Sequence, residues 1–298
     1  KAERAKLVTG AVLISAGGEP VPSIKELQRI IASRITAAIA QDRDNVPLAL
    51  RVTSLTPSLI SKKRKHSQVS SSSEVNGATP TSVWMDCDPG HDDAIALLLL
   101  CNHPSLRVVG VTAVAGNQTV HKTYANAVKL MAIAGRADIP CYKGQAKPMI
   151  RPPKHDPGIH GESGLDGSPT FDEFSREVPA PAGWAEKKGV LAMGAAIAAD
   201  PADRITIIAT GALTNIALFL NLFPELKPKI ERIVFMGGAM GIGNRHPVAE
   251  FNIVCDPEAA KIVVDSGLEV VMVPLEVTHT AIFTREVQQR VEAMGGKL

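Results

Sequence analysis

The sequence has few aromatic residues, few cysteines and no long apolar run. Phe, Trp and Tyr make up 4% of its 298 residues, whereas hydrophobic residues make up 45%. No apolar run approaches the roughly 18 to 20 residues that a membrane-spanning helix needs, and the run from Ala94 to Cys101 is far too short. We therefore expect no membrane-embedded segment, and a soluble globular chain with one large domain, or one domain with an extension.

The cysteines are also too scattered for a zinc site or a disulfide framework. Cys87, Cys101, Cys141 and Cys255 lack CxxC spacing, so we expect a reducing, cytoplasmic setting. A charged segment followed by an apolar stretch and a small-residue cleavage site is missing at the start. Because the first residue is Lys1, we expect the sequence to be a fragment at this end.

Charge is distributed unevenly along the chain. Residues 1–80 hold 12 Lys and Arg against 6 Asp and Glu, a net +6, and the remaining residues hold 20 against 24, a net −4. We predict a basic, partly disordered extension over 1–81 and one domain over 82–298. The serine-rich segment Ser61–Ser82 has too little apolar surface to order and is interpreted as a flexible linker. Its Lys62–Lys65 run is interpreted as a solvated basic segment, with a nuclear import signal or weak nucleic-acid contact as the alternative.

From residue 83 onward, short β-branched runs alternate with longer segments of helical periodicity. The expected strands are 83–88, 106–116, 203–211, 230–238 and 268–276, and the expected helices are 92–102, 119–134, 189–199, 213–221, 256–266 and 284–294. Such alternation predicts an α/β fold with an open, mostly parallel, Rossmann-like (doubly wound) sheet and helices on both faces.

Ligands of such sheets bind beyond the carboxyl ends of the strands. The residues at or just after the predicted strand ends are Asp88, Asn117, Thr210, Met236 and Glu276. One shared site at this edge of the sheet is therefore expected.

Four aspartates lie within eight residues at the start of the main domain. We expect Asp86 and Asp88 on one face of the first strand and Asp92 and Asp93 in the first turn of the next helix, joined by the turn Pro89–Gly90. Carboxylates this close raise one another's pKa unless a cation neutralises them. A helix N-terminus stabilises one or two acids but not four, so a metal site is favoured. Because no Cys or His stands in metal spacing, the expected ion is a hard cation such as Ca²⁺ or Mg²⁺.

The run from Asp86 to Asp93 resembles the N-terminal signature of the inosine-uridine preferring nucleoside hydrolases. Further matches follow in the family's order: AVAGN ending at Asn117, IHGESGLDG at 159–167, ATGALTNIA at 209–217, VFMGGA at 234–239 and NRHPVAEFNIVCDPEAA at 244–260. The resemblance covers Ser82 to Leu298. Within the family, the chain looks most like the fungal uridine nucleosidases.

The resemblance implies a Ca²⁺-dependent enzyme that hydrolyses the N-glycosidic bond of ribonucleosides, with uridine favoured and inosine and cytidine next. The carboxylates of Asp88 and Asp93 and the backbone carbonyl of Thr210 would bind Ca²⁺. Asp88 would also be the general base for a Ca²⁺-bound water that attacks the anomeric carbon. A homodimer or homotetramer is implied, and neither a membrane nor a nucleic acid is expected as a partner.

The resemblance also assigns the ribose hydroxyls. Asp92 would bind the 2′-hydroxyl, Asn252 the 3′-hydroxyl, and Glu250 with Asn244 the 5′-hydroxyl. Cleavage at the anomeric carbon passes through an oxocarbenium-like state, so side chains that hold the sugar turn binding into alignment at the reacting carbon.

Three further residues take roles near the sugar and the base. Asn117 would help to position metal, water and ribose, Met236 would lie against the sugar, and His160 would lie on a mobile loop near the base. Plainer interpretations stay open: Asn244 and Asn252 as turn residues, Met236 as a core residue and His160 as a solvated loop residue.

Two residues of the same motifs are interpreted as structural at this stage. His91 is interpreted as a structural or surface residue. Asp256, before Pro257, is interpreted as a helix N-cap.

The family also carries a late His-Asp pair, in which the Asp binds calcium and ribose and the His serves the leaving base. That pair would fall beyond Leu298, so we expect a domain truncated at its carboxyl end. One alternative is therefore a catalytically incomplete chain that only binds metal and ribose. Another is a Mg²⁺-dependent phosphohydrolase, because Asp86-x-Asp88 superficially resembles the haloacid dehalogenase pattern, although Gly90 stands where that pattern expects Thr or Val.

Overall fold

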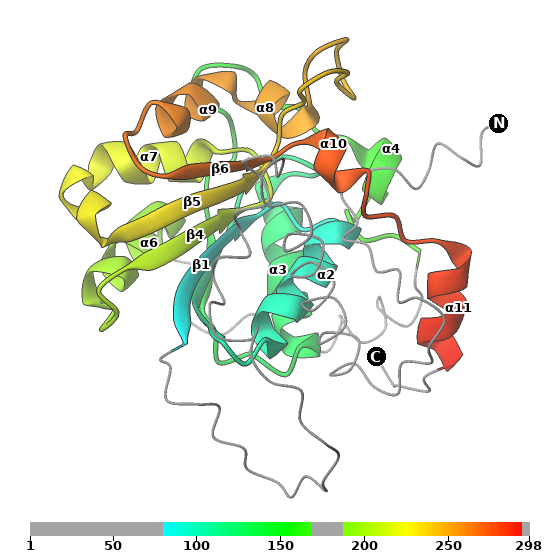
Figure 1. Cartoon of the computed structure of the whole chain (residues 1–298), viewed down its shortest axis with the longest axis horizontal. Helices are drawn as coiled ribbons and strands as arrows, with labels where there is room; N and C mark the ends of the chain where they lie inside the picture. The colour runs from blue at the N-terminus through cyan, green and yellow to red at the C-terminus, as the bar shows by residue number, and fades with distance from the viewer. Residues whose placement is uncertain (1–79, 168–186, 294–298) are drawn as a thin grey trace, which may run out of the picture.

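The computed structural model describes residues 80–167 and 187–293 (Figure 1). The basic extension predicted over 1–81, with its Lys62–Lys65 run, therefore lies outside the described residues except at its last positions.

The first strand, β1 (Thr81–Cys87), begins earlier than expected. The end of the predicted linker, Ser61–Ser82, thus belongs to the sheet. Ser82 is buried, and its hydroxyl accepts a hydrogen bond from Arg107 at 2.6 Å and donates one to Asp200 at 3.3 Å. These tertiary contacts order residues whose composition alone favours a loop.

Six parallel strands form one sheet in the order β3-β2-β1-β4-β5-β6 within the described part of the chain. The other strands are β2 (Leu106–Ala113), β3 (Cys141–Lys143), β4 (Ile205–Ala209), β5 (Ile230–Met236) and β6 (Val270–Val273). The predicted doubly wound α/β fold is confirmed, and the five predicted strands are present. Strand β3 was not predicted, because three residues are too few to show an apolar run.

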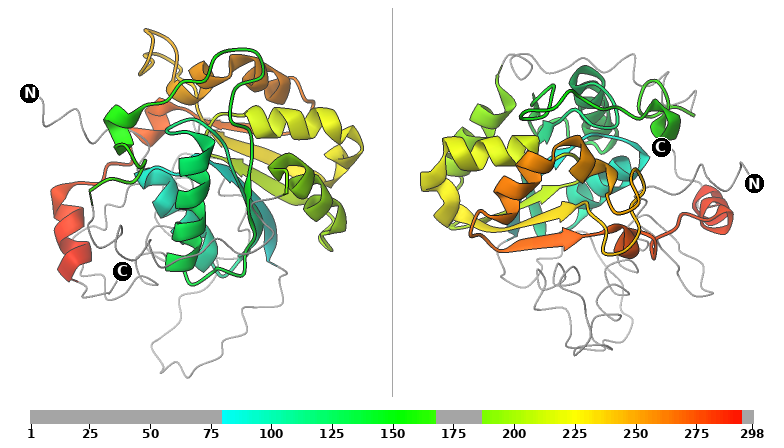
Figure 2. Two further views of the ribbon diagram at one scale, coloured as in Figure 1. Left: turned by 180° about the vertical axis from the view of Figure 1, so that it is seen from behind. Right: turned by 90° about the horizontal axis from the view of Figure 1, so that it is seen from above.

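Helices cover both faces of the sheet (Figures 1 and 2). Helices α2 (His91–Asn102) and α3 (Val120–Ile133) pack on one face, and α6 (Gly189–Ala199), α7 (Thr214–Leu222) and α9 (Pro257–Val264) pack on the other. The shorter elements are α4 (Pro157–His160), η3 (Pro224–Lys229), α8 (Phe251–Cys255) and α10 (Leu275–Thr278), and α11 (Arg285–Ala293) comes last. No helix among these is long and apolar enough to cross a bilayer.

The alternation of buried side chains along β1 explains why helices cover both faces of the sheet. Val83, Met85 and Cys87 pack with α2 and α3, whereas Trp84 packs in the other core with α6, α7 and α9. Successive strand residues point to opposite faces, and all four side chains are fully buried. Strands that are buried on both faces are typical of parallel sheets covered by helices.

The strand order reverses between β1 and β4, and the site is expected at this point. From β1 the chain winds outward to β2 and β3, and from β4 it winds in the other direction to β5 and β6. In the pairing of β1 with β4, Asp86 lies opposite Ala209, so Asp88 and Thr210 leave the sheet side by side. Ligands of doubly wound sheets bind in the crevice at this reversal.

The Trp84 side chain of β1 packs directly against Gly110 of the neighbouring strand β2. Its indole Nε1 donates to Thr112 Oγ1 at 3.1 Å, and its ring stacks on Tyr142 with centroids 6.2 Å apart. A Cβ on Gly110 would lie 2.5 Å from this ring. The glycine is therefore required by packing rather than by backbone conformation.

Gly110→Ala should destabilise the protein by about 2 kcal/mol, because the added methyl group overpacks a core that cannot relax freely. Chemical denaturation followed by tryptophan fluorescence measures the change. Gly241→Ala is the matched control, since its Cβ would meet Glu276 at an ordinary 3.5 Å, and it should change stability by less than about 0.5 kcal/mol. Equal effects of the two variants would contradict the packing explanation.

Candidate functional site

Asp88 follows β1, and its side chain is surrounded largely by main-chain atoms. Its side chain is 1% exposed, and its Oδ2 accepts a hydrogen bond from the main-chain N–H of Asn117 at 2.8 Å. The side chain of Asn117 donates in turn to the Asp88 carbonyl at 3.0 Å. A Cβ on either Gly116 or Gly211 would collide with the Asp88 carboxylate. Two glycines therefore let the backbone close around this group.

Asp93 places a second carboxylate in the same region, from the first turn of α2. Its Oδ2 accepts from the main-chain N–H of Gly90 at 2.9 Å, and its Oδ1 accepts from the hydroxyl of Thr210. Asp88 Oδ1, in contrast, is buried without a hydrogen-bond partner. Burial raises the pKa of Asp93 to about 6. Burial, and then the charge of Asp93, raise the pKa of Asp88 well above its ordinary value.

Asp86 has a different environment from the other three aspartates. Its Oδ1 accepts from the Thr112 hydroxyl and from Asn215 Nδ2, the latter at 2.8 Å. Asn215 also accepts from the main-chain N–H of Gln145 at 2.8 Å. Burial raises the pKa of Asp86 to about 7, although the two hydrogen bonds offset part of this rise. Asp86 therefore ties strand ends together and does not line the cavity described below.

The donors around Asp88 and Asp93 fit a hard cation, because all are oxygens and one carboxylate oxygen has no partner. The backbone oxygen of Thr210, the third predicted donor, accepts from Asn252 Nδ2 at 2.8 Å and keeps a second lone pair. No group of three or more His, Cys, Asp or Glu side chains is arranged for a metal within residues 80–167 and 187–293. Because Ca²⁺ takes about six to eight oxygen ligands, further oxygens must come from water, substrate or residues outside this set.

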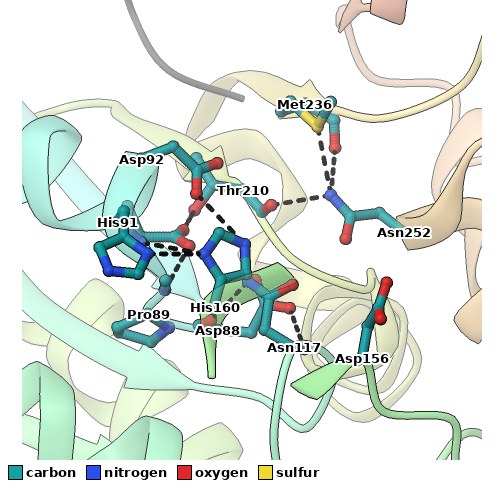
Figure 3. Close-up of polar contacts among 12 residues, drawn as sticks. Asp88, Pro89, His91, Asp92, Asn117, Asp156, His160, Thr210, Met236 and Asn252 are labelled. Carbon is teal, nitrogen blue, oxygen red and sulfur yellow. Dashed lines mark hydrogen bonds and ion pairs between the residues drawn. The ribbon is translucent and has the colours of Figure 1, made fainter. Parts of the chain in front are cut away.

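A cavity opens beside these carboxylates (Figure 3). It is lined by Asp92, Asn117, Asp156, Ile159, His160, Thr210, Met236, Asn244, Arg245, Glu250, Phe251 and Asn252. Eight of the ten predicted site residues are in this lining, and the other two, Asp88 and Asp93, are bonded to it through Asn117 and Thr210. The cavity volume is about 30 Å³, room for a water molecule but less than the roughly 300 Å³ of a small-ligand pocket. A ribonucleoside would therefore require the surrounding loops to move apart.

The predicted ribose-binding residues are held by backbone hydrogen bonds. Glu250 caps α8, and its carboxylate accepts from the main-chain N–H groups of Asn252 at 2.9 Å and Gly238 at 3.0 Å. Burial raises its pKa. Asn252 Nδ2 donates to the carbonyl of Met236 at 3.2 Å, and Asn244 Oδ1 accepts from the main-chain N–H of Phe251 at 2.9 Å. Asn244 thus also has the turn role that was left open, and Met236 lies at the cavity rather than only in the core.

His160 is buried rather than solvated. It ends α4, its side chain is 5% exposed, and its Nε2 lies 3.7 Å from Asp92 Oδ1. Burial, and then the charge of His91, lower the pKa of His160 to about 4, so the imidazole is neutral near pH 7. Burial, and then the charge of Asp93, raise the pKa of Asp92. Figure 3 shows the His160 ring beside His91 and below Asp92, with dashed lines to both.

Sequence reasoning missed an ion pair across the cavity. Asp156 and Arg245 are paired, and the guanidinium of Arg245 lies 5.4 Å from the ring centroid of Phe251. Arg245 follows Asn244 and Phe251 stands between Glu250 and Asn252, so proximity to predicted residues was the available signal.

Two other sequence-based assignments have clear outcomes. Glu276 does not end a strand at the site: it lies in α10 and accepts from the main-chain N–H groups of Met240 and Gly241. Asp256 is confirmed as the N-cap of α9, since its side chain accepts from Ala259 N at 3.0 Å.

The comparisons with known proteins agree with this arrangement. Residues 83–298 match the inosine-uridine preferring nucleoside hydrolase family. The chain is 46% identical over 213 residues to the pyrimidine-specific ribonucleoside hydrolase RihA of Escherichia coli O9:H4 (strain HS), covering 72% of this chain and 66% of that relative. The chain thus spans about two thirds of the relative's length.

Solved structures give the same picture. A plant nucleoside hydrolase matches with a TM-score of 0.59 and 32% identity, covering 67% of this chain and 61% of the other. A purine-preferring ribonucleoside hydrolase from Gardnerella vaginalis matches with a TM-score of 0.64 and 28% identity, covering 73% and 68%. Since the family match includes most of the chain, this protein belongs to the inosine-uridine preferring nucleoside hydrolase family.

Proposed function

We propose that the protein hydrolyses the N-glycosidic bond of ribonucleosides to ribose and free base, with uridine preferred and inosine and cytidine as further substrates. The observation that carries this proposal is the pair of buried carboxylates, Asp88 and Asp93, beside a cavity lined by polar side chains at the reversal of strand order. The pyrimidine-specific activity in the name of the RihA relative supports the preference for uridine.

Asp88 is the proposed general base. Its free Oδ1 can accept a proton from a water that attacks the anomeric carbon. Asp93 and Thr210 would bind Ca²⁺ together with Asp88. A bound Ca²⁺ would lower the pKa of the attacking water and orient it.

The sugar would be held along the cavity wall. Asp92 is proposed to bind the 2′-hydroxyl, Asn252 the 3′-hydroxyl, and Glu250 with Asn244 the 5′-hydroxyl. Asn244, Glu250 and Asn252 are held by the hydrogen bonds described above, so little freedom is lost when the ribose binds. In their ionised forms, the carboxylates of Asp92 and Glu250 would favour the positive charge that develops on the sugar.

The remaining cavity residues complete the proposed site. Asn117 positions Asp88 and the attacking water, and Met236 packs against the sugar. His160, neutral and buried at the cavity, is proposed to lie near the base and to assist its departure. We further propose a cytoplasmic role in nucleoside salvage and a homodimeric or homotetrameric assembly, as the family resemblance implies.

The protein should release ribose from uridine in the presence of Ca²⁺, and a chelator should stop the release because Asp88 and Asp93 then lose their cation. Reducing-sugar assays with uridine, inosine and cytidine measure this and rank the substrates. Asp88→Asn is the matched variant and should lower kcat by about a thousandfold, since it removes the base and a metal ligand together. Release that survives both the chelator and Asp88→Asn would refute the mechanism, and Ca²⁺ binding without release would identify a chain that only binds.

The cation-free protein should lose stability as the pH rises from about 4 to about 7. The pKa of Asp93 is raised from 3.8 to about 6 when folded, so between these values the folded state holds a proton that the unfolded chain has already lost, and this contribution is gone once the pH has passed through about 6. Melting temperatures in chelator measure the slope, and Asp93→Asn should make it less steep, because Asp86, Asp88 and Asp92, whose pKa values are also raised, still titrate. An identical pH slope in Asp93→Asn would show that this carboxyl does not titrate as described.

Asn252→Ala should weaken binding of a ribonucleoside about tenfold, the effect of one lost hydrogen bond, without weakening binding of the free base. Calorimetry with pseudouridine, whose C-glycosidic bond resists hydrolysis, and with uracil separates the two. Asn221→Ala, at an exposed position of α7, is the control and should change neither. Equal losses for pseudouridine and uracil would count against a ribose contact.

A further inference from the structure

His91 contacts His160 in three ways. Its main-chain N–H donates to His160 Nδ1 at 3.3 Å, its ring Nδ1 lies 3.0 Å from the same atom, and the two rings stack with centroids 5.3 Å apart. His91 is itself exposed, whereas His160 beneath it is 4% exposed. His91 therefore forms the solvent-facing cover of a buried cavity residue.

The other ring nitrogen of His91 reaches the loop that follows His160. Its Nε2 lies 2.9 Å from the Asp166 carbonyl, which can only accept, so this nitrogen carries a proton. The Asp166 carboxylate in turn accepts from the main-chain N–H groups of Glu162 at 2.7 Å and Ser163 at 2.9 Å. One exposed imidazole thus connects α2 to both ends of the turn that begins at His160.

The contacts also orient the His160 ring. Its Nδ1 faces the main-chain N–H and the ring Nδ1 of His91. Nε2 faces Asp92 Oδ1, which is buried and has no hydrogen-bond partner. A Cβ on Gly90 would lie 2.7 Å from the His160 ring, so the ring is held from this side as well.

We propose that His91 is a positioning residue that holds the His160 ring with its Nε2 towards Asp92 and the cavity, and holds the 160–166 turn against α2. This rests on the proposed function only for its effect on turnover, since the contact between the two rings exists without substrate.

The first test follows the His160 ring itself. Nitrogen-15 NMR of histidine-labelled protein, with the His160 signals assigned through His160→Gln, should show a single His160 tautomer. His91→Leu should shift both ring-nitrogen signals of His160, because the contact with His91 Nδ1 and the ring stacking are lost and only the main-chain N–H remains. His91→Asn, whose side-chain amide can still form a hydrogen bond with His160 Nδ1, should largely retain the original signals. Unchanged His160 signals in His91→Leu would overturn the proposal.

The second test measures turnover of uridine with Ca²⁺. His91→Leu should lower kcat by about tenfold, comparable to one lost hydrogen bond, with a smaller change in KM, and His91→Asn should restore most of it. His121→Leu is the matched control, an exposed histidine in the first turn of α3, and should change neither the His160 signals nor kcat. A kcat that stays unchanged in His91→Leu while the NMR signals shift would overturn the effect on turnover. If the wild-type protein does not hydrolyse nucleosides, the NMR test still decides whether His91 positions His160.

Discussion

The burial of two carboxylates at the carboxyl ends of β1 and β4 is the constraint on which the site depends. Asp88 and Asp93 are each 1% exposed, and neither has a cationic side chain among its hydrogen-bond partners described above. Burial of a charge without a compensating charge is costly, and the raised pKa of both groups reflects this cost. A bound divalent cation would offset the cost of burying these charges, because negative charge in a low-dielectric environment attracts a cation more strongly than it does in water.

The fold supplies this constraint through the reversal of strand order. The strands β1 and β4 are parallel, but the chain leaves their ends in opposite directions and a crevice forms there. Asp88 and Thr210 lie side by side at this crevice. Gly116 and Gly211 allow the backbone to approach the Asp88 carboxylate closely. Three of the proposed ribose-binding side chains, Asn244, Glu250 and Asn252, come from the β5–α8 region and line the same cavity. Separate segments of the chain thus contribute to one cavity without any of them being long.

Much of the fold could be predicted from local patterns in the sequence, whereas most of the candidate site residues followed from the family resemblance of the motifs. Alternating β-branched and helical periodicity predicted the doubly wound sheet, and residues after the strand ends, such as Asp88 and Thr210, were expected at a common edge. What sequence reasoning missed depends on tertiary contacts. The burial of Ser82 requires Arg107 and Asp200, and the role of Asp86 requires Asn215, 129 positions away.

The same limit applies to residues that act through a partner. Arg245 pairs with Asp156, and His91 contacts His160 69 positions later in the chain. Both residues stand beside predicted site residues in the sequence, but the partner of each becomes apparent only in the folded chain. A motif gives the residue types at the centre of a site, whereas the contacts that orient them become visible only when the chain has folded.

The most direct test of the central claim is a calorimetric titration of the chelator-stripped protein with Ca²⁺, repeated with Asp93→Asn. The account predicts one binding site in the wild-type protein and its loss in the variant, because Asp88 alone cannot hold the ion. Equal Ca²⁺ affinity in the two proteins, or no binding by the wild-type protein, would contradict the assignment of this buried carboxylate pair as a cation site.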